Sequence, residues 1–94
     1  MEARFELGKI VVTAGVAERM GSDFLFKTFI AYSIERHRRG IWGDVCKEDV
    51  EANEEALKDE LRLMSVYKDV EVPDIWIITE SNLKITTVLF PEEY

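Results

Sequence analysis

LRLMSVYKDVEVPDIWIITESNLKITTVLF, residues 61–90, contains three short runs rich in Val, Ile, Thr and aromatic residues. Such residues fit the pleated, half-buried surface of a β-sheet, so we expect strands over residues 61–70, 75–80 and 84–90. The short link before Lys84 predicts a hairpin in which Asn82 has a positive φ, and the segment around Pro73 predicts a looser connection. The stretch therefore predicts a three-strand antiparallel meander.

The N-terminal part of the chain predicts one more strand and two helices. Residues 5–13, FELGKIVVT, form a short β-branched run that is typical of a strand. Thr13 can then cap a short helix over residues 16–20, which Gly21 closes. Ser22 is a favourable N-cap for a longer helix over residues 23–37. The apolar residues of that helix recur at three- and four-residue steps: Phe26, Phe29, Ile30 and Ile34.

A third helix is expected over residues 47–58. Its inward stripe contains Cys46, Val50, Asn53 and Leu57. A buried amide without a partner costs about 1–3 kcal/mol, so Asn53 must have a hydrogen-bond partner. Cys46 has no histidine near it in the sequence and takes a position that suits a small buried side chain, which favours an inert core thiol.

These elements together predict a single α+β domain over residues 1–94. We expect an approximately four-stranded antiparallel sheet, made of the N-terminal strand and the C-terminal three-strand meander, with two or three helices packed on one face. Neither face of the expected strands is purely polar. The outer face of the sheet can therefore carry enough apolar surface for a second copy of the chain to associate with it.

The composition points to a cytoplasmic protein. The 94 residues include one cysteine and 47% hydrophobic residues, with neither a signal-peptide pattern nor a membrane-spanning apolar run. The formal net charge is −7, which disfavours contact with a phosphate backbone over most of the surface. We expect no metal, no cofactor, no membrane partner, and no direct nucleic-acid binding except at a basic cluster of Arg36, Arg38 and Arg39. The helix dipole and the stop at Gly40 also account for that cluster without a ligand.

Four blocks of the sequence carry a resemblance to a known family. They are WGDVCKEDVEANEEAL, RLMSVY, IWIITE and TTVLFPEEY, which occur in this order. Together they resemble a family of short proteins of uncharacterised function encoded on bacterial plasmids and integrated mobile elements. The similarity covers residues 40–94 and the first expected strand. The resemblance implies a mobile-element habitat rather than an activity, and in that family the segment before the Trp-Gly pair is shorter and less basic.

Two sets of residues are candidates for a functional site. If the chain is an enzyme, the candidates for catalysis are His37, Arg62, Tyr67 and Thr86. The candidates for binding are Trp42, Asp49, Asn53 and Arg62. Asp49, Asn53 and Arg62 form either a ligand site or a structural brace, and the sequence leaves both interpretations open.

Three functions fit these patterns. The first is a non-enzymatic protein that acts through protein–protein interaction, including an acidic inhibitor whose carboxylates at residues 44–60 imitate nucleic acid. The second is a small toxin-like ribonuclease of barnase- or RelE-like layout, with His37 as base, Arg62 stabilising the phosphorane, and Tyr67 or Thr86 positioning it. The third is a ligand-free homodimeric accessory protein. We favour the first, and the acidic net charge of −7 opposes the RNA binding that the second requires.

Overall fold

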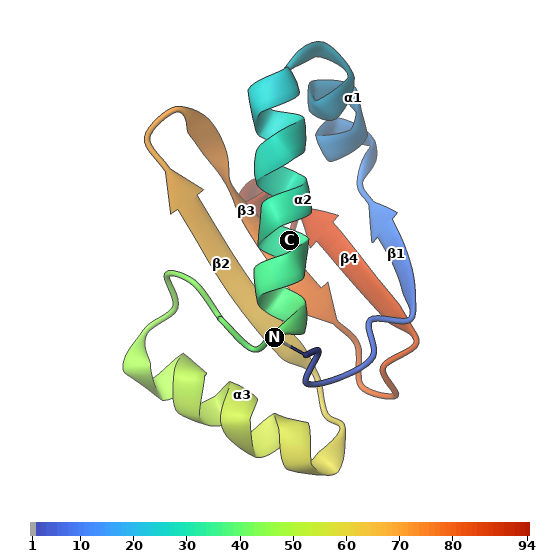
Figure 1. Cartoon of the computed structure of the whole chain (residues 1–94), viewed down its shortest axis with the longest axis vertical. Coiled ribbons are helices and arrows are strands. Elements are labelled where there is room, and N and C mark those ends of the chain that lie inside the picture. The colour runs from blue at the N-terminus through green and yellow to red at the C-terminus, as the bar shows by residue number, and fades with distance from the viewer. Residues whose placement is uncertain (1) are drawn as a thin grey trace.

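The computed structural model describes residues 2–94, in which three α-helices and four strands build one α+β unit (Figure 1). The elements are β1 (Lys9–Val12), α1 (Ala14–Ser22), α2 (Phe24–Arg38), α3 (Lys47–Asp59), β2 (Leu63–Asp69), β3 (Val72–Thr79), β4 (Ile85–Leu89) and a 3-10 turn, η1 (Pro91–Glu93). The strands form one sheet in the order β1-β4-β3-β2. The predicted α+β class is confirmed.

The sheet is mixed rather than wholly antiparallel. β2, β3 and β4 form the predicted antiparallel meander. β1 pairs with β4 in parallel, with Ile10 opposite Thr86 and Val12 opposite Val88. The expectation of a fully antiparallel sheet was therefore wrong at this pair. Three helices lie between β1 and the meander. A connection of this length lets β1 run in the same direction as β4, whereas a tight hairpin would require opposite directions.

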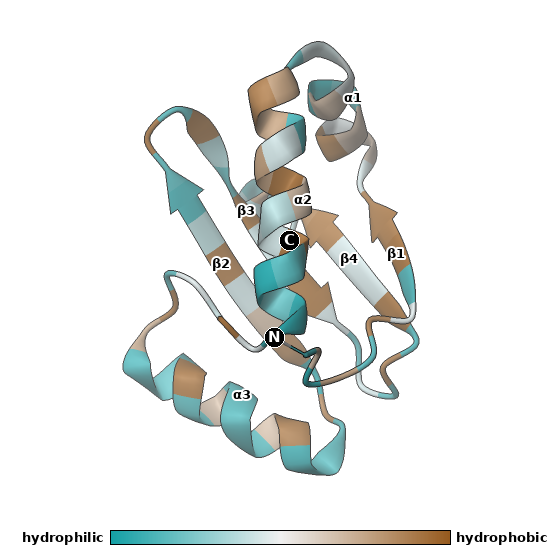
Figure 2. Cartoon of the chain, in the orientation of Figure 1, coloured by the Kyte–Doolittle hydropathy of each residue, from teal (hydrophilic) through white to brown (hydrophobic). Residues whose placement is uncertain are grey.

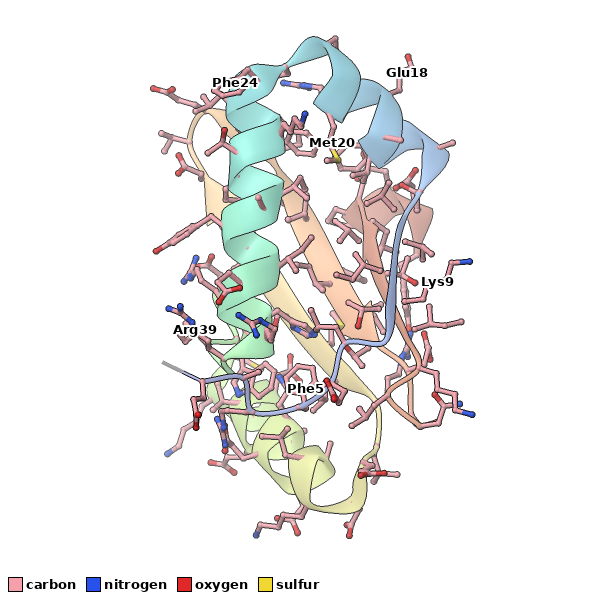
Figure 3. The ribbon with its side chains drawn as sticks, turned by 45° about the vertical axis from the view of Figure 1, so that its right-hand side comes forward. Phe5, Lys9, Glu18, Met20, Phe24 and Arg39 are labelled. Atoms are coloured by element: carbon pink, nitrogen blue, oxygen red, sulfur yellow. The ribbon has the colours of Figure 1, made fainter. Side chains whose placement is uncertain are left out.

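The core lies between α2 and one face of the sheet. Figure 1 shows α2 crossing in front of the strands, and Figure 3 shows side chains filling the layer between them. The main cluster consists of buried residues from α1, α2 and the meander: Val16, Phe26, Ile30, Tyr67, Ile75, Ile77 and Val88. A second cluster joins the N-terminal segment and the Trp42 loop to α3 and β2: Phe5, Leu7, Trp42, Ala56 and Leu63.

The first helix is longer than expected, and this moves the cap of the second. Thr13 caps α1 as predicted, because its hydroxyl accepts from Val16 N at 3.2 Å. α1 continues through Gly21 to Ser22, so the predicted N-cap of α2 is wrong. Asp23 caps α2 instead, and its carboxylate accepts from Phe26 N at 3.1 Å. A carboxylate at this position also favours the positive end of the helix dipole.

The first strand is shorter than expected. The predicted run began at Phe5, but β1 begins at Lys9 because Gly8 has a φ of +65° and interrupts the extended backbone. A Cβ at Gly8 would lie 2.3 Å from the Lys84 carbonyl, so the close approach of this segment to β4 requires glycine. Phe5 and Leu7 are buried before the strand starts.

The outer edge of β2 is covered by side-chain and loop groups. Asn53, 5% exposed on α3, has the predicted partner: its Nδ2 donates to Met64 O at 2.8 Å, and its Oδ1 accepts from Met64 N at 3.1 Å. Farther along, Val66 N donates to Trp42 O at 3.2 Å and Asp44 N donates to Val66 O at 2.6 Å. Lys68 N donates to the Asp44 carboxylate at 3.0 Å. The edge strand is therefore paired along most of its length.

Two members of the predicted α3 stripe do not lie inside. Cys46 is exposed, which corrects the expectation of a core thiol, and Val50 is also exposed. Cys46 is the N-cap of α3 and has an extended φ and ψ of −75° and 168°. Its side chain therefore does not follow the helical period that places Asn53 and Ala56 inside.

Removal of the Asn53 amide tests its role at the sheet edge. Asn53→Ala leaves the Met64 N–H and C=O without partners, so we expect a loss of about 2 kcal/mol in the free energy of unfolding. Urea denaturation followed by far-UV circular dichroism measures this loss. Glu51→Ala, an exposed change on the same helix, is the control and should shift stability by less than about 0.5 kcal/mol. Equal stability of the two variants would contradict the role of the amide.

Candidate functional site

His37 lies at the centre of a buried chain of hydrogen bonds. Its Nδ1 is 2.5 Å from the Ser65 hydroxyl on β2, and its Nε2 is 2.9 Å from the Thr79 hydroxyl on β3. Thr79 in turn lies 2.8 Å from the hydroxyl of Thr86 on β4. Thr86 donates to Leu7 O at 2.6 Å. One histidine of α2 is thereby joined to three strands and to the N-terminal segment.

The end of this chain fixes the direction of its protons. A hydroxyl has one proton, and the Thr86 proton goes to the Leu7 carbonyl. Thr86 must therefore accept from Thr79, and Thr79 must accept from His37 Nε2–H. The chain of hydrogen bonds therefore requires a proton on Nε2 of His37. In a neutral ring with its proton on Nε2, Nδ1 accepts from Ser65.

The surroundings of His37 oppose its protonation. His37, Ser65 and Thr79 have no exposed area, and the rings of Phe5 and Trp42 lie edge-on to the imidazole at 5.2 and 5.8 Å. Burial lowers the pKa of His37 to about 3. The imidazole is therefore neutral near pH 7 and has no contact with solvent. In this structure it connects α2 to the sheet and cannot reach a substrate.

The four candidates for catalysis do not form one exposed site. Thr86 has no exposed area and meets His37 only through Thr79. Tyr67 is also buried; its hydroxyl donates to Ile41 O at 2.6 Å, and burial raises its pKa to about 12. Arg62 is exposed and lies apart from this chain.

Arg62 contacts the C-terminus. Its Nη1 donates to the Tyr94 hydroxyl at 2.8 Å, and its guanidinium lies 5.3 Å from the centre of the Tyr94 ring. The Tyr94 ring packs edge-on to Trp76 at 5.2 Å. Arg62 Nε is also 3.7 Å from a Glu80 oxygen. Of the five N–H donors of Arg62, the hydrogen bond to Tyr94 uses one, and Glu80 places a carboxylate beside the guanidinium.

Three of the four candidates for binding do come together. Asp49, Asn53 and Arg62 line a hollow of about 310 Å³ between α3 and β2. The Asn53 amide is occupied by the Met64 backbone, so it is a structural brace. Asp49 and Arg62 are the charged groups that face the hollow.

The remaining binding candidate, Trp42, is 4% exposed and lies outside this hollow. Its indole N–H donates to Glu54 at 3.0 Å, and Arg4 forms two further bonds to that carboxylate at 2.7 and 2.9 Å. The bonds from Arg4 and then from Trp42 lower the pKa of Glu54 to about 2. Trp42 therefore joins the N-terminal segment to α3 rather than contacting solvent.

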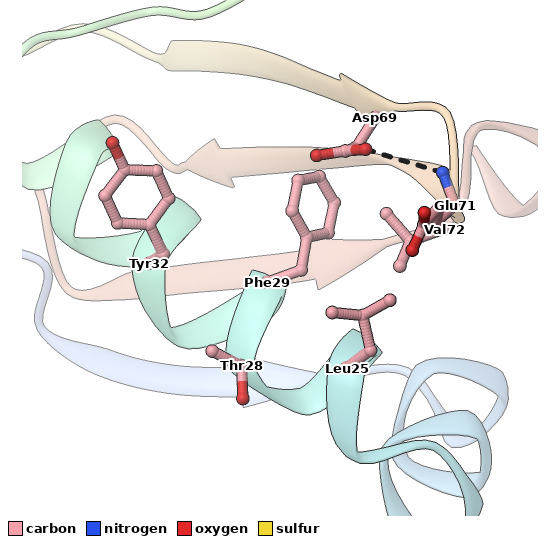
Figure 4. A pocket seen from close by; sticks show the side chains of 7 residues that line it. All are labelled: Leu25, Thr28, Phe29, Tyr32, Asp69, Glu71 and Val72. Atoms are coloured by element: carbon pink, nitrogen blue, oxygen red, sulfur yellow. Dashed lines mark hydrogen bonds between the residues drawn. The ribbon is translucent and has the colours of Figure 1, made fainter.

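A second concave region, which the sequence analysis missed, lies between α2 and the β2–β3 hairpin (Figure 4). It measures about 230 Å³ and is lined by Leu25, Thr28, Phe29, Tyr32, Asp69, Glu71 and Val72. Figure 4 shows Phe29 between Tyr32 and Leu25, with Asp69 and Glu71 on the facing hairpin. The walls are mainly apolar.

The two elements that form this groove also carry large exposed apolar side chains. Phe24 is 82% exposed, Tyr32 63% and Val70 97%. We use the name α2–hairpin surface for Phe24, Leu25, Thr28, Tyr32 and Val70 together with the groove. The sequence contains a sign of this surface. Residues 24–32, FLFKTFIAY, include one charged residue, Lys27, so the start of α2 is apolar on nearly every side.

Comparisons with known proteins found no matching family model, curated protein or solved structure. No helix within residues 2–94 is long and apolar enough to cross a membrane. The same residues contain no group of three or more His, Cys, Asp or Glu side chains arranged to hold a metal ion.

The pH dependence of stability tests the burial of neutral His37. The pKa of His37 is 6.5 in a model peptide and about 3 in the folded protein, so the unfolded chain binds the proton more tightly. The stabilisation is complete above pH 6.5 and is lost progressively as the pH falls toward 3. We expect the free energy of unfolding to fall by about 2 kcal/mol between pH 7 and pH 5, measured by urea denaturation.

His37→Gln is the comparison for this measurement. Glutamine does not titrate, so the variant should be less stable at pH 7 and should lose most of the decline between pH 7 and pH 5. An equal decline in both proteins would show that other groups produce it.

Proposed function

We propose that this chain is a non-enzymatic binding protein that docks another protein through the α2–hairpin surface. One observation carries the proposal: the first half of α2 is apolar on its outer side as well as on its core side. Phe26 and Ile30 are buried against the sheet, whereas Phe24 and Tyr32 on the same helix are largely exposed. Lys27 and Thr28 are the exposed polar residues of this half, and a helix with apolar residues on two sides is normally covered on both.

The size of the apolar surface supports an interaction. Phe24, Tyr32 and Val70 together expose on the order of 400 Å² of side chain, since an aromatic residue offers about 150–250 Å². This is within the range of the largest apolar patch on a monomeric protein, and such patches are often functional. In Figure 2 the brown of apolar residues recurs along the upper part of the α2 ribbon, whereas the α3 ribbon has more teal, hydrophilic residues than brown ones.

The ribonuclease alternative has weaker support. It requires an accessible general base, and the proposed base, His37, has no exposed area. It also requires Arg62 to act on the same phosphate as Tyr67 or Thr86, yet Arg62 is exposed beside Tyr94 whereas Tyr67 and Thr86 are both buried. The net charge of −7 further opposes RNA binding.

An acidic inhibitor is the second candidate, and the position of α3 favours it. α3 lies at one end of the molecule and packs along the edge of the sheet (Figure 1). Glu48, Glu51 and Glu55 are exposed there, whereas Glu54 is held by Arg4. The resemblance to mobile-element proteins fits either a host protein or an element-encoded protein as the target.

Substitutions on the α2–hairpin surface test the proposal. Phe24→Ser with Val70→Ser removes two large exposed apolar groups, so the variant should fold normally and lose its partner. Leu61→Ser with Ile85→Ser, at exposed apolar positions elsewhere, is the matched control. Tagged proteins are compared by affinity capture from an extract of the native cells, after thermal melts confirm that each is folded.

The expected result is a defined protein retained by the wild type and the control but lost by the Phe24 and Val70 variant. Equal retention by all three proteins would contradict docking at this surface. Loss on Glu51→Gln with Asp59→Asn, and not on the Phe24 and Val70 change, would favour the acidic inhibitor.

A further inference from the structure

We infer that the α2–hairpin surface receives a basic amphipathic helix of a partner protein, with its apolar side on the groove and Lys or Arg side chains at Asp69 and Glu71. This inference rests on the proposed function and adds the chemistry of the partner. The dimensions of the groove, its helical wall and its charges each contribute to it.

The dimensions favour a side chain over a free small molecule. The groove measures about 230 Å³, which is below the approximate range of 300–1,000 Å³ typical of small-molecule sites. Its floor and walls come mainly from Leu25, Phe29, Tyr32 and Val72. A single large apolar side chain fits such a groove. Phe24 and Val70 are exposed and are neighbours in sequence of residues that line it, so they extend the apolar contact.

The wall formed by α2 has the spacing that a second helix needs. Leu25, Phe29 and Tyr32 stand at positions i, i+4 and i+7, so they form one ridge about 10 Å long. Ridges of this kind pack into the groove between the ridges of a neighbouring helix. An amphipathic helix that lies in an apolar groove uses the same spacing for its own anchoring residues.

The charges beside the groove determine which charge the partner helix must have. Asp69 and Glu71 are exposed, and within residues 2–94 neither carboxylate forms an ion pair within 4.0 Å. Arg36, the cation that follows Tyr32 on α2, lies over the rings of Tyr32 and Tyr67 at 5.4 and 4.8 Å. Two carboxylates without cations at an apolar groove complement Lys or Arg on an incoming helix.

A second copy of this chain fits the groove less well. Each copy carries a net charge of −7, and pairing two α2–hairpin surfaces would bring four hairpin carboxylates together. Lys27 is the only basic residue among residues 24–32 that could oppose them. Charge complementarity therefore favours a basic partner over self-association.

Binding of two synthetic peptides tests the inference. The probe is the 14-residue peptide LKKLLKLLKKLLKL, and its counterpart has glutamate at every lysine. Fluorescence anisotropy of each labelled peptide is measured against the full chain at about 0.15 M salt, where long-range attraction is screened. We expect the lysine peptide to bind and the glutamate peptide to bind at least about tenfold more weakly.

Matched charge variants locate the binding. Asp69→Asn with Glu71→Gln removes the hairpin carboxylates and should weaken binding of the lysine peptide about three- to tenfold. Glu51→Gln with Asp59→Asn makes the same change of charge on α3 and should weaken it less than about twofold. All four positions are exposed, so both variants should fold.

Three results would overturn the inference. They are failure of the lysine peptide to bind, equal binding of the glutamate peptide, and a loss on the α3 variant as large as on the hairpin variant. Sedimentation that reveals a dimer dissolved by the Phe24 and Val70 change would instead make a second copy the occupant. The proposed function is judged separately, because protein capture that depends on Phe24 and Val70 can succeed even if both peptides fail.

Discussion

The fold depends on one neutral imidazole held between two buried hydroxyl groups, those of Ser65 and Thr79. His37 is the last buried residue of α2, and its two ring nitrogens contact β2 and β3 directly and β4 through Thr79. Each member of the chain has a partner, so the burial of these polar side chains is compensated. Apolar contacts can tolerate a shift of α2 along the sheet, but this chain of hydrogen bonds cannot. The directional bonds therefore fix where α2 lies on the sheet, and with it the position of the groove at the other end of the helix.

At the edge of β2, polar groups likewise hold other segments in position, here α3 and the loop between α2 and α3. The Asn53 amide offers one donor and one acceptor in the arrangement of a peptide group, and it pairs with the two backbone groups of Met64. The Trp42 and Asp44 backbones continue the pairing at Val66. Gly43 permits this approach because its φ is +79° and a Cβ there would lie 2.1 Å from Val66 O. The loop between α2 and α3 is thereby held as an extension of the sheet.

Local residue preferences predicted most of this fold, and the errors arose where distant segments decide the outcome. β-branched residues indicated the three-strand meander, and helical spacing placed Asn53 inside with an obligatory partner. The parallel direction of β1 could not be deduced from its own residues, because the crossover of three helices sets it. Cys46 was misplaced because the helical period was extended to a residue outside the helix. The role of His37 required the register that sets Thr79 opposite Thr86, which no single strand contains.

The sheet has two edges of different kinds, and this limits how copies of the chain can add to one another. β2 is occupied along most of its outer edge, while β1 has a strand neighbour on the β4 side alone within residues 2–94. Growth of a cross-β fibre needs an open template on both sides of every unit. A unit with one open side joins at most one other unit, and the joined pair has no open side left. Edge-to-edge addition of folded chains therefore stops at two, so open-ended fibre growth would require the Asn53 and Asp44 contacts to break first.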